Sequence, residues 1–125
     1  MEVRVDWIDS DAVVTPLAED FLGGNSEMFR VQMKPVIGSA RNIVVDFEQV
    51  RFLDSAGCGM LLSIRKALVA AGGRIHLANV SDAIRIVLDA VRLGDFFPTF
   101  PSRALAIAAL QGEGADRTDS GPALK

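Results

Sequence analysis

The chain has 125 residues, half of them hydrophobic, which suits one domain with a packed core. Its net charge of −3 at pH 7 provides no basic surface for nucleic acid, and a single Cys and a single His exclude an internal disulfide and the usual metal-site spacings. The charged first residues do not form a signal peptide and no apolar run is long enough to span a bilayer, so we expect a cytoplasmic protein that needs no cofactor, metal or membrane.

The chain begins with a predicted β-hairpin. Val3, Val5 and Trp7 alternate with charged residues, as in a half-buried strand, and residues 12–14 form a second short strand. Polar residues between the two runs favour a turn.

A loop and a helix come next. Residues 17–24 are expected to form the loop, and Asn25-Ser26 is a helix start signal in front of an apolar face. Pro35 lies within that helix and predicts a kink or an early end, because proline cannot continue the backbone hydrogen bonding.

The middle of the chain predicts a buried strand, a polar elbow and a long helix. The strand covers residues 42–47, and the helix begins at about Ser55 and stops at Gly72-Gly73. One face of this helix is apolar and carries Cys58, Leu61, Ile64 and Leu68.

The remaining segments repeat the pattern. Ile75 and Leu77 lie in a further strand, and Ser81 is a good N-cap for a helix with a clean apolar stripe. Residues 102–110 predict a last, Ala-rich helix, and residues 112–125 a disordered tail. The order of strands and helices predicts a single α/β domain over residues 1–111, with a mixed β-sheet of about four to five strands packed with about four helices.

The most informative motif is Asp54-Ser55-Ala56-Gly57, at the start of the long helix. The first turn of a helix has free backbone N–H groups and carries the positive end of the helix dipole. A phosphoryl group on Ser55 would therefore enter a ready-made anion site. Asp54 and Ser55 are also good N-cap residues, so helix capping is the alternative interpretation.

This motif and its surroundings resemble the STAS family of anti-sigma factor antagonists. The pattern covers NIVVDFEQVRFLDSAGCGMLLSIRKALVAAGGRIHLANVSDAIRIVLDAVRLGDFF, and more broadly residues 1–110. The resemblance implies a regulatory domain in which a partner serine kinase phosphorylates Ser55 and a phosphatase reverses it. It further implies partner-binding roles for Asp20, Asp54, Ser55, Ala56 and Gly57. The acidic run that the family carries near Asp20 is replaced here by Leu-Ala-Glu-Asp-Phe.

Several residues keep two interpretations. Gly57 and Gly59 weaken a helix start, which indicates either close approach of a partner or tight packing on the chain's own strand. Asp20 is either a partner contact or a solvated loop carboxylate. Cys58, near a helix start that would lower its pKa, is expected to be buried and inert. His76 is expected on the surface of its strand.

We therefore expect a phosphorylatable anti-sigma factor antagonist-like protein. It would bind an anti-sigma serine kinase, or a related histidine-kinase-like ATPase, and be switched off by phosphorylation of Ser55. The alternative is a STAS-type module that senses a small ligand or anion, or a scaffold in a signalling complex. An enzyme is not expected, because no catalytic residues emerge from the sequence.

Overall fold

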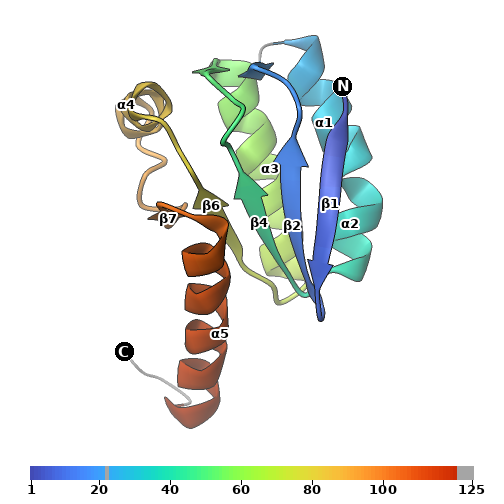
Figure 1. The fold of residues 1–125 in the computed structure, drawn as a ribbon, viewed down its shortest axis with the longest axis vertical. Helices are drawn as coiled ribbons and strands as arrows, with labels where there is room; N and C mark the ends of the chain where they lie inside the picture. The colour runs from blue at the N-terminus through green and yellow to red at the C-terminus, as the bar shows by residue number, and fades with distance from the viewer. Residues whose placement is uncertain (22, 121–125) are drawn as a thin grey trace.

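A five-stranded sheet with the strand order β1-β2-β4-β6-β7 forms the centre of the fold in a computed structural model, which describes residues 1–21 and 23–120 (Figure 1). The strands are β1 (Val3–Ile8), β2 (Asp11–Pro16), β4 (Asn42–Asp46), β6 (Ile75–Ala78) and β7 (Thr99–Phe100), with β3 (Asp20–Phe21) and β5 (Phe52–Leu53) as a separate pair. The helices are α1 (Gly24–Gln32), α2 (Lys34–Ser39), α3 (Ser55–Ala70), α4 (Asp82–Ala90) and α5 (Arg103–Ser120).

The sheet is mixed, as the sequence predicted. Strands β1 and β2 form the antiparallel hairpin, and β2, β4, β6 and β7 run parallel to one another. The unit β4-α3-β6 is the predicted β-α-β crossover, with α3 between two adjacent parallel strands. The predicted α/β class is therefore confirmed.

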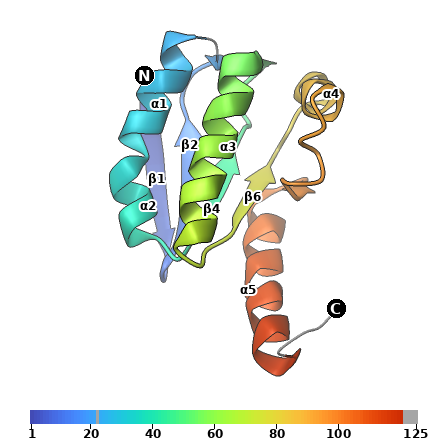
Figure 2. The same cartoon turned by 180° about the vertical axis from the view of Figure 1, so that it is seen from behind.

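The two faces of the sheet are covered unequally. Helices α1, α2 and α3 lie over one side of the sheet, in front of it in Figure 2, and α4 lies to the side, beyond β6. Together they enclose the main core, whose largest members are Phe21, Phe29, Phe47, Phe97 and Met33. Helix α5 covers the other face with a small second core around Val44 and Ile107. Within the described residues, no helix is both long and apolar enough to cross a membrane.

Local start and stop signals act where the sequence places them. The predicted interruption at Pro35 is present, because α1 ends at Gln32 and α2 restarts with this proline in its first turn. The Ser81 hydroxyl accepts a hydrogen bond from the Ile84 N–H (3.2 Å) as the N-cap of α4. Gly72 has a φ of 88° after α3, and the Gly73 N–H returns to the Leu68 carbonyl oxygen (2.9 Å), which closes the helix.

Three expectations about the strands and the last helix are wrong. Trp7 is 49% exposed, because β1 is an edge strand whose only neighbour among the described strands is β2. His76 is 1% exposed, because β6 lies inside the sheet and α5 covers this face; its Nδ1 lies 3.2 Å from the Ala106 carbonyl oxygen.

The last helix is longer than predicted. Helix α5 extends to Ser120, past the expected end at Leu110 and into the segment that we expected to be disordered. Elongation of an established helix adds one hydrogen bond per residue, so a helix that begins with an Ala-rich segment can continue through residues of lower helix propensity. Residues 121–125 of that expected tail lie outside the described residues.

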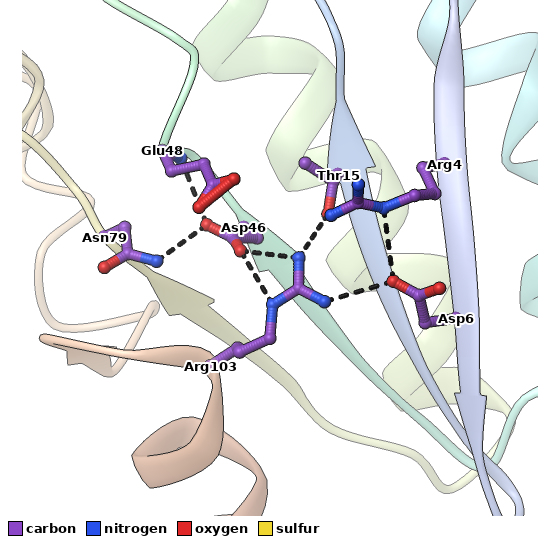
Figure 3. A network of polar contacts seen from close by, with 7 residues as sticks. All are labelled: Arg4, Asp6, Thr15, Asp46, Glu48, Asn79 and Arg103. Carbon is purple, nitrogen blue, oxygen red and sulfur yellow. Dashed lines mark hydrogen bonds and ion pairs between the residues drawn. The ribbon is translucent and has the colours of Figure 1, made fainter.

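A polar network attaches the start of α5 to the sheet (Figure 3). The Arg103 guanidinium donates to the Asp46 carboxylate (2.8 and 3.0 Å), to Asp6 (3.1 Å) and to the Thr15 hydroxyl (2.8 Å). Asp46 is fully buried and also accepts from the Asn79 side chain (2.9 Å). A buried carboxylate needs such partners, so this network fixes where α5 leaves the sheet.

Candidate functional site

The predicted site lies at the first turn of α3, and Asp54 orders it. Asp54 has an extended backbone (φ −108°, ψ −173°), and its Oδ1 accepts a hydrogen bond from the Gly57 N–H at 2.9 Å. The Asp54 carbonyl oxygen accepts from the Cys58 N–H at 3.0 Å. Asp54 is therefore the N-cap, and Ser55 is the first residue of the helix.

Ser55 is exposed, and the backbone beside it is available. In the part of the chain that the structure describes, no hydrogen bond uses the N–H groups of Ser55 or Ala56, because the cap satisfies those of Gly57 and Cys58 instead. These two groups point out at the positive end of the helix dipole. An anion carried by the Ser55 hydroxyl would meet both donors.

A second segment holds the same turn from the side. Strands β3 and β5 pair in parallel, with Asp20 opposite Phe52, and the Asp54 N–H donates to the Phe21 carbonyl oxygen (3.4 Å). The other oxygen of Asp54 accepts from the Gly23 N–H (3.3 Å). The structure thus brings the predicted residue Asp20 next to the segment that leads into the helix.

Asp20 has a local structural partner in this arrangement. Its carboxylate accepts a hydrogen bond from the Asn25 side chain at 2.9 Å, and its carbonyl oxygen accepts a second at 3.2 Å. The side chain is half-buried and orders the approach to α1. From the sequence we expected a plain loop over residues 17–24, because the two-residue strand β3 has no periodicity of its own and forms only by pairing with β5.

The two glycines of the turn differ in their surroundings. A Cβ at Gly57 would meet the Leu53 side chain and would lie 2.8 Å from the Phe21 carbonyl oxygen, whereas a Cβ at Gly59 would meet nothing within 4 Å. The close approach at Gly57 therefore comes from the chain's own strands, which favours the packing alternative for this buried residue. Gly59 is exposed and leaves the helix surface open.

A small cleft opens beside the turn, between α1 and α3. It has a volume of about 230 Å³ and is lined by Gly23, Ser26, Glu27, Arg30, Ala56, Gly59 and Met60. Arg30 binds Glu27 with two hydrogen bonds (2.6 and 3.1 Å), which lowers the pKa of this carboxyl and neutralises most of the local charge. The Ser26 hydroxyl oxygen is buried and, within the described residues, has no hydrogen-bond partner.

An exposed aromatic residue stands next to the turn and was missed in the sequence. Phe52 is 59% exposed on β5, and Leu62, two turns into α3, is 39% exposed. Exposed apolar side chains beside a functional group commonly mark a protein contact. The signal available in the sequence was a Phe inside the polar elbow, three residues before Ser55.

The other polar candidates do not form a catalytic centre with this turn. Cys58 is 5% exposed, and burial together with the Asp54 carboxylate raises its pKa, contrary to the expected lowering. His76 lies on the α5 side of the sheet, whereas α3 packs on the opposite side. Among the described residues, no cluster of His, Cys, Asp and Glu side chains could hold a metal ion.

Comparison with known proteins identifies the family of this chain and agrees with its fold. Residues 5–106 match the STAS domain, so the chain belongs to the STAS domain family. It is similar to the anti-sigma F factor antagonist of Paenibacillus polymyxa, with 27% identity over 88 residues, which cover 69% of this chain and 75% of that protein. The anti-sigma F factor antagonist of Lysinibacillus sphaericus is 28% identical over 96 residues, 75% of this chain and 82% of that protein.

Solved structures of the anti-sigma factor antagonist SpoIIAA have the same fold. The unphosphorylated form superposes with a TM-score of 0.76 at 24% identity, covering 89% of this chain and 97% of that one. The phosphorylated form of SpoIIAA, from Bacillus, superposes with a TM-score of 0.67 at 25% identity, covering 86% and 98%. The predicted family is therefore confirmed.

Proposed function

We propose that this chain is an anti-sigma factor antagonist that binds an anti-sigma serine kinase, or a related histidine-kinase-like ATPase, and is switched by phosphorylation of Ser55. The observation that carries the proposal is the exposed Ser55 at the first position of α3, beside two backbone N–H groups that have no hydrogen-bond partner among the described residues. Relatives named anti-sigma F factor antagonists, and a phosphorylated form of SpoIIAA, support the same role.

Two electrostatic effects act on a phosphate at this position. The N–H groups of Ser55 and Ala56 and the helix dipole stabilise it in the free protein, by about 0.3–1 kcal/mol for the dipole. The phosphate adds about −1.5 to −2 charges at pH 7, next to the Asp54 carboxylate. A partner that packs closely over this turn, on Phe52 and the open surface at Gly59, would meet both the bulk and the charge. Phosphorylation therefore releases the partner while the domain stays folded.

The partner surface in this proposal consists of the first turn of α3 and the segments that hold it. Asp54 and Asp20 shape the surface through their hydrogen bonds to Gly23 and Asn25, and Ser55 and Ala56 are exposed at its centre. Gly57 contributes through packing beneath it. A serine phosphatase would act on the same exposed hydroxyl to restore binding.

The decisive experiment combines phosphorylation with binding. The chain is incubated with ATP and a purified anti-sigma-type serine kinase from the same genome, and the phosphate is located by mass spectrometry. We expect a single phosphate on Ser55 that a serine phosphatase removes. Phosphate on Ser63, Ser81 or Ser102 in place of Ser55 would contradict the proposal, and Ser55→Ala is the matched control.

A second candidate function rests on the cleft beside the turn. The buried Ser26 hydroxyl lines this cleft and has no partner within the described residues, so a small anion could occupy the space without covalent chemistry. The Glu27 carboxylate, which already binds Arg30, opposes an anion there. Calorimetric titration with inorganic phosphate tests this alternative, with Ser26→Ala as the control. Binding that Ser26→Ala abolishes, without phosphorylation of Ser55, would favour a sensing module.

A further inference from the structure

Strand β1 presents an open edge of the sheet. It is the first strand in the order β1-β2-β4-β6-β7, and β2 is its only neighbour among the described strands. The Leu17 N–H donates to the Glu2 carbonyl oxygen (2.9 Å), and Pro16, opposite Val3, has no N–H to give. In an antiparallel ladder the direction of the backbone groups alternates, so the even-numbered residues bond to β2. The backbone groups of Val3, Val5 and Trp7 therefore point outward.

We infer that two copies of this chain pair through β1, antiparallel, with Val5 opposite Val5 of the second copy. In this register Arg4 of each copy faces Asp6 of the other, which gives two Arg4–Asp6 pairs on the side of the sheet that carries α5. Within one copy Arg4 and Asp6 already form an ion pair (3.3 Å between Nε and Oδ2), but their side chains are about half exposed (51% and 45%), so both remain accessible to a second copy. Opposite charges directly across a ladder stabilise it. The two sheets then form one continuous sheet.

Charge selects this register over its neighbours. The outward backbone groups belong to odd-numbered residues, so odd-numbered residues of one copy must lie opposite odd-numbered residues of the other. The symmetric registers that satisfy this condition differ in the residue at the centre of the pairing, and neighbouring registers differ by one residue there. A centre at residue 4 places Arg4 against Arg4, and a centre at residue 6 places Asp6 against Asp6. Like charges directly opposite are unfavourable. Only the centre at Val5 joins Arg4 to Asp6 at both ends.

The apolar side of the edge fits a second copy as well. Pairing about Val5 sets Trp7 of one copy opposite Val3 of the other, on the face that carries α1 and α2, and Trp7 is 49% exposed in the single chain. Helix α1 flanks the same edge (Figure 1), and its Met28 lies beside the amino group of Met1 (4.0 Å). Met28 and Val31, on neighbouring turns, are 47% and 49% exposed. A bare edge with exposed apolar side chains favours pairing.

The inference is independent of the proposed function, because it uses β1 and α1 and not the turn at Ser55. Sedimentation equilibrium of the purified chain measures the monomer–dimer constant directly. Trp7 is the only Trp, so its fluorescence reports burial at the edge during dilution. We expect a dimer whose Trp7 emission shifts to longer wavelength as it dissociates. A chain that remains monomeric up to about 1 mM, the weak end of specific affinities, overturns the inference.

Charge reversal tests the register. In a dimer of the Arg4→Glu variant both pairs between residues 4 and 6 would be acidic, and in a dimer of the Asp6→Lys variant both would be basic. Each variant alone is therefore expected to be monomeric. An equimolar mixture restores both opposite-charge pairs and is expected to form a heterodimer. Failure of the mixture to associate, with both variants folded by circular dichroism, contradicts this register.

Asp6 also binds Arg103, so a second variant guards against a folding defect. Val5→Pro removes one outward N–H and no hydrogen bond to β2, and proline is tolerated on edge strands in this orientation. We expect its dimer dissociation constant to rise about 10- to 100-fold, because two hydrogen bonds are lost per dimer. Val5→Ala keeps the N–H and is the matched control. Equal dimerisation of Val5→Pro and Val5→Ala would place the interface elsewhere and overturn the inference.

Discussion

Replacing Gly57 by alanine separates packing within the chain from contact with a partner. A Cβ at this position would lie 2.8 Å from the Phe21 carbonyl oxygen and would also meet the Leu53 side chain. Real Cβ atoms do not approach a carbonyl oxygen so closely, so backbone must move. That carbonyl is held in place, because it accepts the Asp54 N–H and belongs to the β3–β5 pair.

The magnitude follows from a comparison with Gly59. Overpacking at a rigid site costs about 1–3 kcal/mol. The intrinsic helix preference for alanine over glycine returns about 1 kcal/mol at either position. A Cβ at Gly59 meets nothing within 4 Å, so Gly59→Ala keeps the gain without the cost. We therefore expect Gly57→Ala to be less stable than Gly59→Ala by about 1–3 kcal/mol.

Thermal unfolding of the two variants and the unchanged protein measures this difference. For a chain of this size, about 1 kcal/mol corresponds to a shift of about 3–5 °C in Tm. Gly59→Ala is expected to melt above the unchanged protein and Gly57→Ala below Gly59→Ala. Equal melting temperatures for the two alanine variants, combined with loss of kinase binding by Gly57→Ala alone, would refute the packing account and restore Gly57 as a direct partner contact.

Three further outcomes are expected. Ser55→Glu should bind the kinase more weakly than Ser55→Ala in calorimetry, because its charge lies beside Asp54; equal affinities would rule out an electrostatic switch. Burial raises the pKa of Cys58 above the 9.0 of a free thiol. The stability that this neutral thiol contributes is therefore fully present below pH 9.0 and declines as the pH rises further. Denaturation of Cys58→Ala, measured over the same pH range, should lack this decline. Arg103→Met should cost about 3 kcal/mol in urea unfolding, because it leaves the buried Asp46 carboxylate without its cation. A cost below about 1 kcal/mol would mean that the remaining hydrogen bonds to Asp46 suffice.

Features set by neighbours in sequence could be predicted from the sequence. The N-caps Asp54 and Ser81 and the helix stop at Gly72 act through hydrogen bonds that span only a few residues. The hairpin and the parallel order of β4 and β6 follow from residue alternation and from the length of the crossover. Their energetics are local, so no knowledge of distant residues was needed to place Ser55 at a helix start.

Other features depend on which segments meet in space. His76 alternates with apolar residues like an exposed strand residue, yet α5, some 30 residues later in the chain, covers it. Phe52 and Asp20 form a ladder only because β3 and β5 pair across a sequence distance of about 30 residues. The role of Gly57 was undecided until the Phe21 carbonyl oxygen was placed beside it.

The sequence by itself determined the fold class, the helix that begins at about Ser55 and the hydroxyl in its first turn. Hydrogen bonding and side-chain periodicity over short distances suffice for these. Only the tertiary structure decided which surface surrounds that hydroxyl, which glycine is fixed by packing and that β1 is left with an open edge. Such properties arise from contacts between segments far apart in the chain, and the free energy of those contacts has no local signature in the sequence.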